Sequence, residues 1–305
     1  MSSRVLVLGA TGMLGHTVLS TLLDMGVPAT GTVRAVSNAP EALQAHVAPF
    51  EAGVDAVDGV VAGLGPGDYV VNCIGVIRHL MRDDDESDRL NAVRINSLFP
   101  YELSAAATAQ GFHVIQIATD CVYSGARGGY DEAALHDATD VYGHSKSLGE
   151  VPSPNFLNLR ASIIGPEVRT ATSLLEWTLA QPAGASIKGF TDHVWNGVTT
   201  ETFARIVAGL VTSGERPSGT RHLVPADVVT KDELVRMILA AFGRTDVTVD
   251  AHETGHRVDR TLSTSYPDAN DAFWAAGGFS ERPTIADMVN RLAAHTNATS
   301  IGNTQ

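Results

Sequence analysis

A short apolar run followed at once by three spaced glycines constrains the fold of this chain more than any other feature. Val5–Leu8 is apolar throughout, as expected of a fully buried parallel strand. Gly9, Gly12 and Gly15 follow, where helical spacing begins over residues 13–25. Glycines at such a junction bring backbone N–H groups and the positive end of a helix dipole to a pyrophosphate. The sequence therefore predicts a dinucleotide-binding unit here, although a glycine triplet alone would also fit an ordinary turn.

Apolar runs and helical stretches alternate along the first half of the chain. Strands alternating with helices at this spacing predict an α/β fold with a doubly wound parallel sheet, the Rossmann arrangement. Ligands of such sheets bind outside the carboxyl ends of the strands. Beyond residues 5–8, strands are expected at 29–33, 46–50, 68–74, 112–118 and 156–160, with helices over 97–110 and 141–150.

The alternation weakens after about residue 165, where prolines separate shorter helices. We therefore expect a cofactor-binding Rossmann domain over residues 1–165, to which some later segments return. A smaller C-terminal lobe over residues 166–305 is expected to bind the substrate. The other expectations are helices over 200–212, 230–242 and 284–294, a solvated acidic loop at 83–88 and a frayed polar tail from about 296.

Composition narrows the classes of partner. The chain has 305 residues, 44% of them hydrophobic, and a formal net charge of -13, which argues against nucleic acid or an anionic membrane. Two cysteines cannot make a disulfide framework, and the spacing of metal ligands is missing. No apolar run reaches the roughly 18 residues that a membrane span needs. We expect a cytoplasmic protein without a metal, in which a few local cations and backbone amides hold any anionic substrate.

A tyrosine and a lysine one helical turn apart predict the chemistry. Tyr142 and Lys146 share a helical face, and the ammonium is expected, with a cationic nicotinamide, to lower the tyrosine pKa toward neutrality. Such a tyrosine can give a proton to a carbonyl oxygen while hydride reaches the carbon. Thr119, directly after the strand at 112–118, is placed to hydrogen-bond the same oxygen. A Tyr-x-x-x-Lys pair often arises by chance, but with Thr119 and the glycine turn it predicts nicotinamide-dependent redox chemistry.

The residues after the second and fourth strands bear on the cofactor. Arg34 stands where an enzyme specific for the unphosphorylated cofactor would place an acid for the ribose hydroxyls. A guanidinium suits a 2′-phosphate, which favours NADP(H), while NAD(H) and a merely solvated Arg34 stay open as alternatives. The expected cofactor contacts are Gly9, Thr11, Gly12, Met13, Leu14, Gly15, Arg34, Cys73, Ile74, Gly75, Tyr142 and Lys146.

In these segments the sequence resembles the extended short-chain dehydrogenase/reductases, and among them the dTDP-4-dehydrorhamnose reductases. The resemblance covers most of residues 4–165 and continues more weakly through 195–200 and 257–262. The matching segments are Gly9–Gly15, Asn72–Gly75, Thr119–Gly125, Asp140–Glu150 and Leu159–Gly165.

The resemblance implies NADPH-dependent reduction of the 4-keto group of a nucleotide-diphosphate 6-deoxy sugar, bound between the two lobes. It also implies that a homodimer is plausible. The residues that carry over from the family are Thr119, Tyr142 and Lys146 as the catalytic set, Glu51 as the adenine contact, and Asp120, Cys121, Asn196 and Arg257 on the substrate side.

Two departures from the family pattern keep other functions open. Acidic residues at 82–89 lengthen the segment after the fourth strand, and Val258 stands where relatives often have proline. The acid that related 4,6-dehydratases place after the Thr-Asp pair is missing, which argues against dehydration. Cys121 instead resembles the cysteine that GDP-fucose synthases use with a histidine for epimerisation, and His193 could be its partner. An epimerase and a non-catalytic nucleotide-sensing protein therefore remain alternatives.

One motif is expected to be misleading. His252-Glu-Thr-Gly-His256 matches the H-E-x-x-H pattern of zinc proteases. That chemistry needs both imidazoles on one face of a helix. The surrounding residues are typical of a strand and a turn, so we expect a surface loop without a metal.

Overall fold

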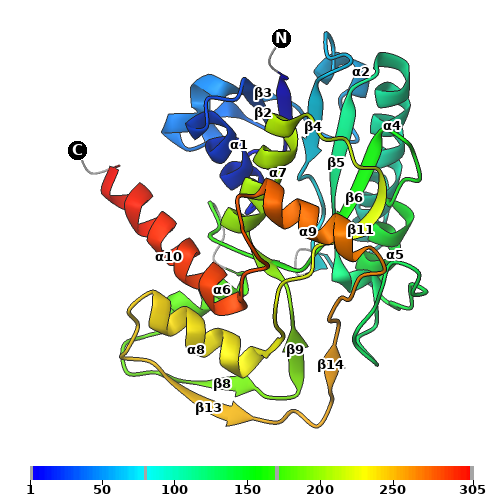
Figure 1. Ribbon diagram of the computed structural model, residues 1–305. Helices are drawn as coiled ribbons and strands as arrows, with labels where there is room; N and C mark the ends of the chain where they lie inside the picture. The colour runs from blue at the N-terminus through cyan, green and yellow to red at the C-terminus, as the bar shows by residue number, and fades with distance from the viewer. Residues whose placement is uncertain (1–2, 79–80, 169–171, 303–305) are drawn as a thin grey trace.

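A seven-stranded parallel sheet forms the centre of the molecule (Figure 1). The computed structural model describes residues 3–78, 81–168 and 172–302. In the sheet the strands follow the order β3-β2-β1-β4-β5-β6-β11, and each pair of neighbours is parallel. The predicted doubly wound sheet is thus confirmed, and its last strand comes from the C-terminal half of the chain. The strands are β1 (Val5–Leu8), β2 (Ala29–Val33), β3 (Val47–Pro49), β4 (Tyr69–Asn72), β5 (His113–Ala118), β6 (Phe156–Arg160) and β11 (Gly219–His222).

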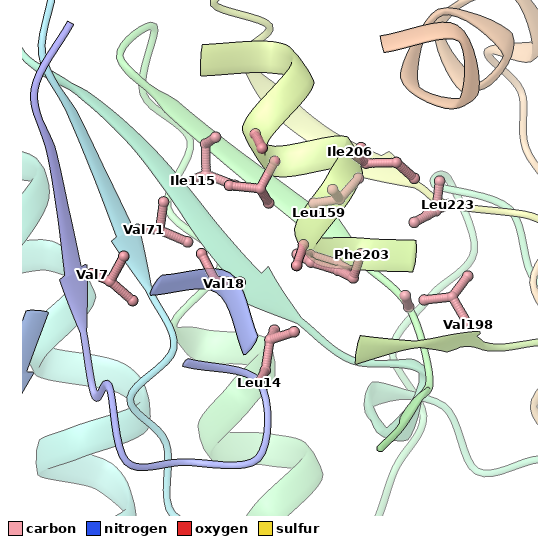
Figure 2. Packing of buried hydrophobic residues seen from close by; sticks show 14 of the residues in the cluster. Val7, Leu14, Val18, Val71, Ile115, Leu159, Val198, Phe203, Ile206 and Leu223 are labelled. Atoms are coloured by element: carbon pink, nitrogen blue, oxygen red, sulfur yellow. The ribbon is translucent and has the colours of Figure 1, made fainter. Parts of the chain in front are cut away.

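Helices cover both faces of the sheet, as the alternation of side chains along its strands requires. Val5 and Val7 of β1 belong to one buried cluster, whereas Leu6 and Leu8 belong to another on the opposite face. Figure 2 shows the first cluster, where the side chain of Phe203 lies with those of the sheet. The first cluster includes α1 (Gly15–Asp24), α7 (Thr200–Ser213), α9 (Pro267–Ala276) and α10 (Ile285–Gly302), and the second includes α2 (Val57–Val60) and α4 (Phe99–Gln110).

The acidic segment differs from the predicted solvated loop. Helix α3 begins at Glu86, and the carboxylate of Asp85 accepts hydrogen bonds from the N–H groups of Ser87 and Asp88 at 2.9 and 3.1 Å. Acidic side chains satisfy free N–H groups at a helix start and complement its dipole, so they favour this helix. The structure runs on from α3 (Glu86–Ala92) through a π-helical turn, η4 (Val93–Leu98), into α4, well before the predicted start at residue 97.

Three small sheets and two helices make up most of the remaining C-terminal half. Figure 1 shows α8, β8, β9, β13 and β14 together at the bottom of the molecule, away from the large sheet. Strand β9 is central in its sheet, antiparallel to β12 and parallel to β14. The elements are α6 (Leu174–Leu179), α8 (Lys231–Ala241), and the pairs or triplets β7 (Ile163–Ile164) with β10 (Val198–Thr199), β8 (Ser186–Phe190) with β13 (Thr248–His252), and β12 (Val229–Thr230) with β9 (His193–Trp195) and β14 (Val258–Asp259).

The C-terminal helix is longer than the sequence predicted. Helix α10 continues to Gly302, beyond the predicted end at residue 294, and the frayed tail from about 296 stays a prediction. Ile285 and Met288 of this helix are fully buried against the core, which anchors its first turns. Over the described ranges, the helices all fall short of the length and apolarity that crossing a bilayer would require.

Candidate active site

The glycine turn after β1 is packed too closely for other residues. Gly9 has φ +83°, and its N–H donates to the Thr32 hydroxyl at 3.1 Å. A Cβ on Gly15 would lie 2.1 Å from the Gly9 carbonyl oxygen. No side chain caps the start of α1 at Leu14, which leaves N–H groups of its first turn available to an anion. The geometry is that of the predicted phosphate turn.

Gly15→Ala tests this packing. The added methyl group must displace the Gly9 backbone, so we expect a loss of about 1–3 kcal/mol in the free energy of unfolding. Binding of NADP(H), measured by fluorescence titration, should weaken as well. Gly59→Ala on α2 is the matched control, because its Cβ would meet nothing within 4 Å. Equal stability and equal cofactor affinity for the two variants would contradict this account of the turn.

The residues expected at the adenosine end lie on the surface. Arg34 directly follows β2, and Glu51 follows β3; both side chains are exposed. Between them, two 3-10 turns, η1 (Val36–Asn38) and η2 (Glu41–His46), connect the strands. Both residues therefore lie at the carboxyl edge of the sheet, and their contact with the cofactor remains a prediction.

An asparagine that the sequence analysis missed fixes the loop after β4. Asn96 lies in the π-helical turn, where its Oδ1 accepts from the Val76 N–H at 2.9 Å. Its Nδ2 donates to the Val76 carbonyl and to the Ser145 hydroxyl, both at 3.0 Å. Asn96 thereby ties the loop that carries Cys73 and Gly75 to the helix that carries Tyr142. Only the π-helical geometry reveals this, because one asparagine in a helical stretch gives no signal in sequence.

The expected catalytic helix, α5 (Val141–Leu148), packs closely against the segment that follows the end of β5. Asp140 caps it by accepting from the Gly143 N–H at 2.7 Å. A Cβ on Gly143 would come within 2.6 Å of the Cys121 carbonyl oxygen, so this glycine permits the close approach. The short turn η5 (Asp120–Val122) follows β5, and the Thr119 hydroxyl caps it by accepting from the Cys121 N–H at 3.1 Å. As a result, the Thr119 hydroxyl lies within hydrogen-bonding reach of the Tyr142 phenol.

Lys146 connects this helix to the cofactor side. Its Nζ donates to the Ile117 carbonyl at 2.9 Å and lies 4.0 Å from where a Cβ on Gly75 would be. Gly9 in turn lies against Ile74, since a Cβ there would be 3.0 Å from Cγ1 of that residue. Burial lowers the pKa of Lys146 to about 8, which the nearby carboxylate of Glu150 opposes. The structure thus brings the predicted catalytic residues next to the glycine turn.

The predicted lowering of the Tyr142 pKa includes the charge of a bound nicotinamide and stays a prediction, whereas the folded chain by itself acts on this pKa in the opposite direction. Burial raises the pKa of the phenol well above its ordinary value, and the acidic groups of Cys121, Asp120 and Asp140 raise it further. The Lys146 ammonium instead bonds the Ile117 carbonyl. Tyr142 is therefore held in its protonated form, which is the form that donates a proton.

Both cysteines are free thiols on half-buried residues. Burial raises the pKa of Cys73 and that of Cys121 to about 12, and the carboxylate of Asp120 contributes to the second shift. The Sγ of Cys121 lies 3.6 Å from the Asp120 Oδ1. Since the thiolate is the reactive form, neither residue has the character of a catalytic base or nucleophile.

We expect both thiols to react slowly with a disulfide reagent in the folded protein at pH 8. In guanidinium chloride, where burial is lost and thiol pKa values return toward about 8.5, both should react quickly. Counting the thiols released over time, with and without denaturant, checks this. Rapid modification of Cys121 in the folded protein would show that its thiolate is accessible.

Two of the residues predicted on the substrate side, Arg257 and Asn196, are engaged in contacts within the protein. Arg257 is exposed and pairs with Asp259, with 2.8 Å between Nη2 and Oδ2. The Asn196 side chain is buried, donates to the Leu262 carbonyl at 2.7 Å and accepts from the Leu262 N–H at 2.9 Å. Its amide thus holds two chain segments together. The ring of His193 packs on Phe190, with 5.0 Å between ring centroids.

Two cations that the sequence analysis missed face the site instead. Lys231, the first residue of α8, interacts electrostatically with Asp120 and Cys121. Arg260 acts on Cys121 and donates from Nε to the Tyr123 carbonyl at 2.8 Å. Side chains three residues apart on an extended chain point to opposite faces, so placing Arg260 at the site turns Arg257 away from it. Lys231 and Arg260 come together through the pairing of strands that are distant in the sequence, and such pairing leaves no local signal in sequence.

The zinc-like motif has the structure expected of a misleading match. His252 ends strand β13, and residues 253–256 continue as loop and turn. Residues 252–256 therefore do not form the helix that would direct both imidazoles at one metal. Within the described ranges, no cluster of three His, Cys, Asp or Glu side chains could hold a metal ion.

Two curated proteins are similar over most of their length. The probable low-salt glycan biosynthesis reductase Agl14 of Haloferax volcanii is 26% identical over 302 residues, which cover 94% of this chain and 96% of that protein. The dTDP-4-keto-6-deoxy-D-glucose reductase of Streptomyces niveus is 25% identical over 251 residues, 80% of each chain.

Solved structures share the fold. A dTDP-4-dehydrorhamnose reductase from Bacillus anthracis in complex with NADP gives a TM-score of 0.73 at 18% identity, covering 97% of this chain and 100% of that one. MoeE5 in complex with UDP-glucose and NAD gives 0.70 at 17% identity, covering 98% and 100%. A family model described as the RmlD substrate binding domain matches residues 3–272. With nearly nine-tenths of its length matched, this chain belongs to the RmlD substrate-binding domain family.

Proposed function

We propose that the protein reduces the 4-keto group of a nucleotide-diphosphate 6-deoxy sugar with NADPH. The observation that carries the proposal is the meeting of Thr119, Tyr142 and Lys146 at the carboxyl ends of the strands, beside the glycine turn. Bound NADPH would supply the hydride. The similarity to a dTDP-4-keto-6-deoxy-D-glucose reductase and to dTDP-4-dehydrorhamnose reductases supports this substrate class.

In this proposal each of the three side chains has a defined role. Tyr142 gives its proton to the C4 oxygen. Thr119 orients the same oxygen by a hydrogen bond. Lys146, which carries its charge below its pKa of about 8, holds the cofactor ribose and stabilises the phenolate formed when Tyr142 loses its proton.

NADP(H) is the proposed cofactor, with NAD(H) as the alternative. Arg34 is exposed at the end of β2 and able to meet a 2′-phosphate, as a guanidinium does well. One of the similar solved structures is a complex with NADP, and others are complexes with NAD. Thr11, Met13 and Leu14 would offer backbone N–H groups to the pyrophosphate, while the Gly12 N–H donates to the Gly9 carbonyl at 3.0 Å.

The proposal also assigns cofactor binding and substrate binding to different parts of the chain. Residues 1–165, joined by β11 and α7, would bind the cofactor, and most of residues 166–305 would bind the nucleotide sugar. A cytoplasmic location and a homodimer belong to it too, the first from cysteine usage and the second from the family resemblance.

The geometry gives less support to an epimerase of the kind that uses a cysteine with a histidine. That reaction would need an acid–base pair beside the sugar, and Cys121 with His193 was the candidate; an epimerase that uses Thr119, Tyr142 and Lys146 and returns the hydride to its substrate stays the alternative. The Cys121 thiol is held protonated by burial, and His193 packs on Phe190 and lies 3.5 Å from the Thr254 hydroxyl. A protein that only senses nucleotides would have no use for the assembled Thr119, Tyr142 and Lys146.

A substrate panel tests the proposal. The protein is incubated with NADPH and, separately, with dTDP-, GDP- and UDP-linked 4-keto-6-deoxy sugars, and the nicotinamide absorbance is followed. We expect stoichiometric NADPH oxidation with at least one of them. Conversion of the sugar without NADPH oxidation would favour the epimerase, and no conversion of any sugar would contradict the proposal.

A further inference from the structure

Strand β2 holds the beginning of the glycine turn, which spans residues 9–15. Thr32 is 1% exposed, and its hydroxyl accepts from the Gly9 N–H at 3.1 Å. The Thr32 carbonyl accepts from the Ala10 N–H at 2.8 Å. A Cβ on Gly31 would lie 2.6 Å from the Cβ of Ala10, so the strand and the turn are in contact here. Thr32 therefore binds the first two N–H groups of the turn.

His16 holds the glycine turn from the side of α1. Its Nδ1 lies 2.9 Å from the Gly12 carbonyl oxygen, and since a carbonyl oxygen only accepts, the ring nitrogen is the donor. The backbone N–H of His16 donates to the same oxygen at 3.2 Å, and the Gly12 N–H donates to the Gly9 carbonyl at 3.0 Å. Both peptide groups that flank Gly12 are thus hydrogen-bonded within the turn and the start of α1.

These contacts determine which N–H groups of the turn are left for a ligand. In a planar trans peptide the carbonyl and the N–H that follows it point in opposite directions. The Gly12 carbonyl is directed at His16, so the Met13 N–H of the same peptide points away from His16. Across residues 3–78, 81–168 and 172–302, no group accepts a hydrogen bond from the N–H groups of Thr11, Met13 or Leu14. These three groups at a helix start are available to an anion.

We infer that Thr32 and His16 are positioning residues for the pyrophosphate of the cofactor. Gly9 and Gly12 permit the shape of the turn, but glycine also leaves a backbone free to adopt many other conformations. A loop that its ligand must order binds that ligand less tightly, because the ordering costs entropy. The contacts from β2 and α1 pre-organise the turn, so its free N–H groups need no rearrangement when the pyrophosphate binds. The inference rests on the proposed function, because it needs a dinucleotide cofactor.

The test measures cofactor binding without any sugar. Isothermal titration calorimetry follows NADP⁺ and, separately, NAD⁺ binding to the wild type and to Thr32→Val and His16→Leu. Valine keeps the shape of threonine and suits a strand, so the first variant removes little more than the hydroxyl. Each variant should weaken the affinity for both cofactors by about 5- to 20-fold, because both cofactors contain the pyrophosphate. Thr32→Ser and His16→Asn keep a hydroxyl and an N–H donor, and they should recover most of the binding.

Two controls separate positioning from a general loss of stability. Thr178 is fully buried and its hydroxyl donates to the Leu174 carbonyl at 2.7 Å within α6, so Thr178→Val also loses a buried hydrogen bond. His256 is exposed, and His256→Leu matches the other change. Both controls should bind the cofactors as the wild type does.

Wild-type affinity in Thr32→Val or in His16→Leu would overturn the inference, and so would equal losses in the controls. These results are independent of catalysis. If the affinities fall as expected but no 4-keto sugar is reduced, the proposed reaction fails and the positioning role stands. If a sugar is reduced and the affinities are unchanged, only the inference fails. A wild-type protein that binds neither cofactor would overturn both.

Discussion

Tyr142→Phe is expected to lower turnover by about 10²–10⁴-fold, the usual contribution of one positioned acid–base group. The ring stays in place, so the half-buried packing of α5 against η5 should be kept. Only the proton and the hydrogen bond to Thr119 are lost. Steady-state kinetics with the best sugar of the panel measures the effect, and cofactor titration shows whether NADPH binding is unchanged.

Tyr101→Phe is the matched control for this variant, since its side chain is exposed on α4. It should keep wild-type turnover. If Tyr142→Phe also keeps wild-type turnover, another group supplies the proton and the role assigned to Tyr142 is refuted.

Glu150→Gln is expected to cost about 3–5 kcal/mol in the free energy of unfolding, because it leaves a buried guanidinium without its counter-charge. Arg160 is only 1% exposed, and its Nε donates to the Glu150 Oε1 at 2.9 Å. The same guanidinium also donates to Tyr123, His136 and His222. This network joins the ends of β6, β11 and α5 behind the catalytic residues.

Urea unfolding, followed by circular dichroism, measures the Glu150→Gln effect. Asp271→Asn is the control, because Asp271 and its partner Arg282 form an exposed pair that contributes at most about 1 kcal/mol. If Glu150→Gln lowers the free energy of unfolding no more than Asp271→Asn does, the Glu150–Arg160 pair does not stabilise the structure around the site, which would contradict this account.

The sequence predicted what depends on neighbouring residues. Apolar runs predicted six strands of the large sheet but missed β11, and the spacing of Tyr142 and Lys146 placed both on one helix. Position relative to a strand end was enough to locate Thr119, because carboxyl ends of parallel strands meet at one edge.

What the sequence could not predict depends on burial and on distant pairing. The Tyr142 pKa rises because the folded chain excludes water from the phenol, which no spacing reveals. Arg257 was taken from the family resemblance, and Arg260 was missed because the alternation of β14 is set by its pairing with β9, sixty-five residues earlier. Lys231 follows β12, which pairs with the other side of β9, and Asn96 reaches its position through a π-helical turn.

The central claim is that hydride reaches C4 of a nucleotide-linked keto sugar while Tyr142 protonates the oxygen. Its most direct test uses NADPH that carries deuterium at the transferable position of the nicotinamide. The product sugar, analysed by mass spectrometry and NMR, should contain one deuterium, bound to C4, for each NADPH oxidised. A converted sugar without deuterium at C4 would contradict the account.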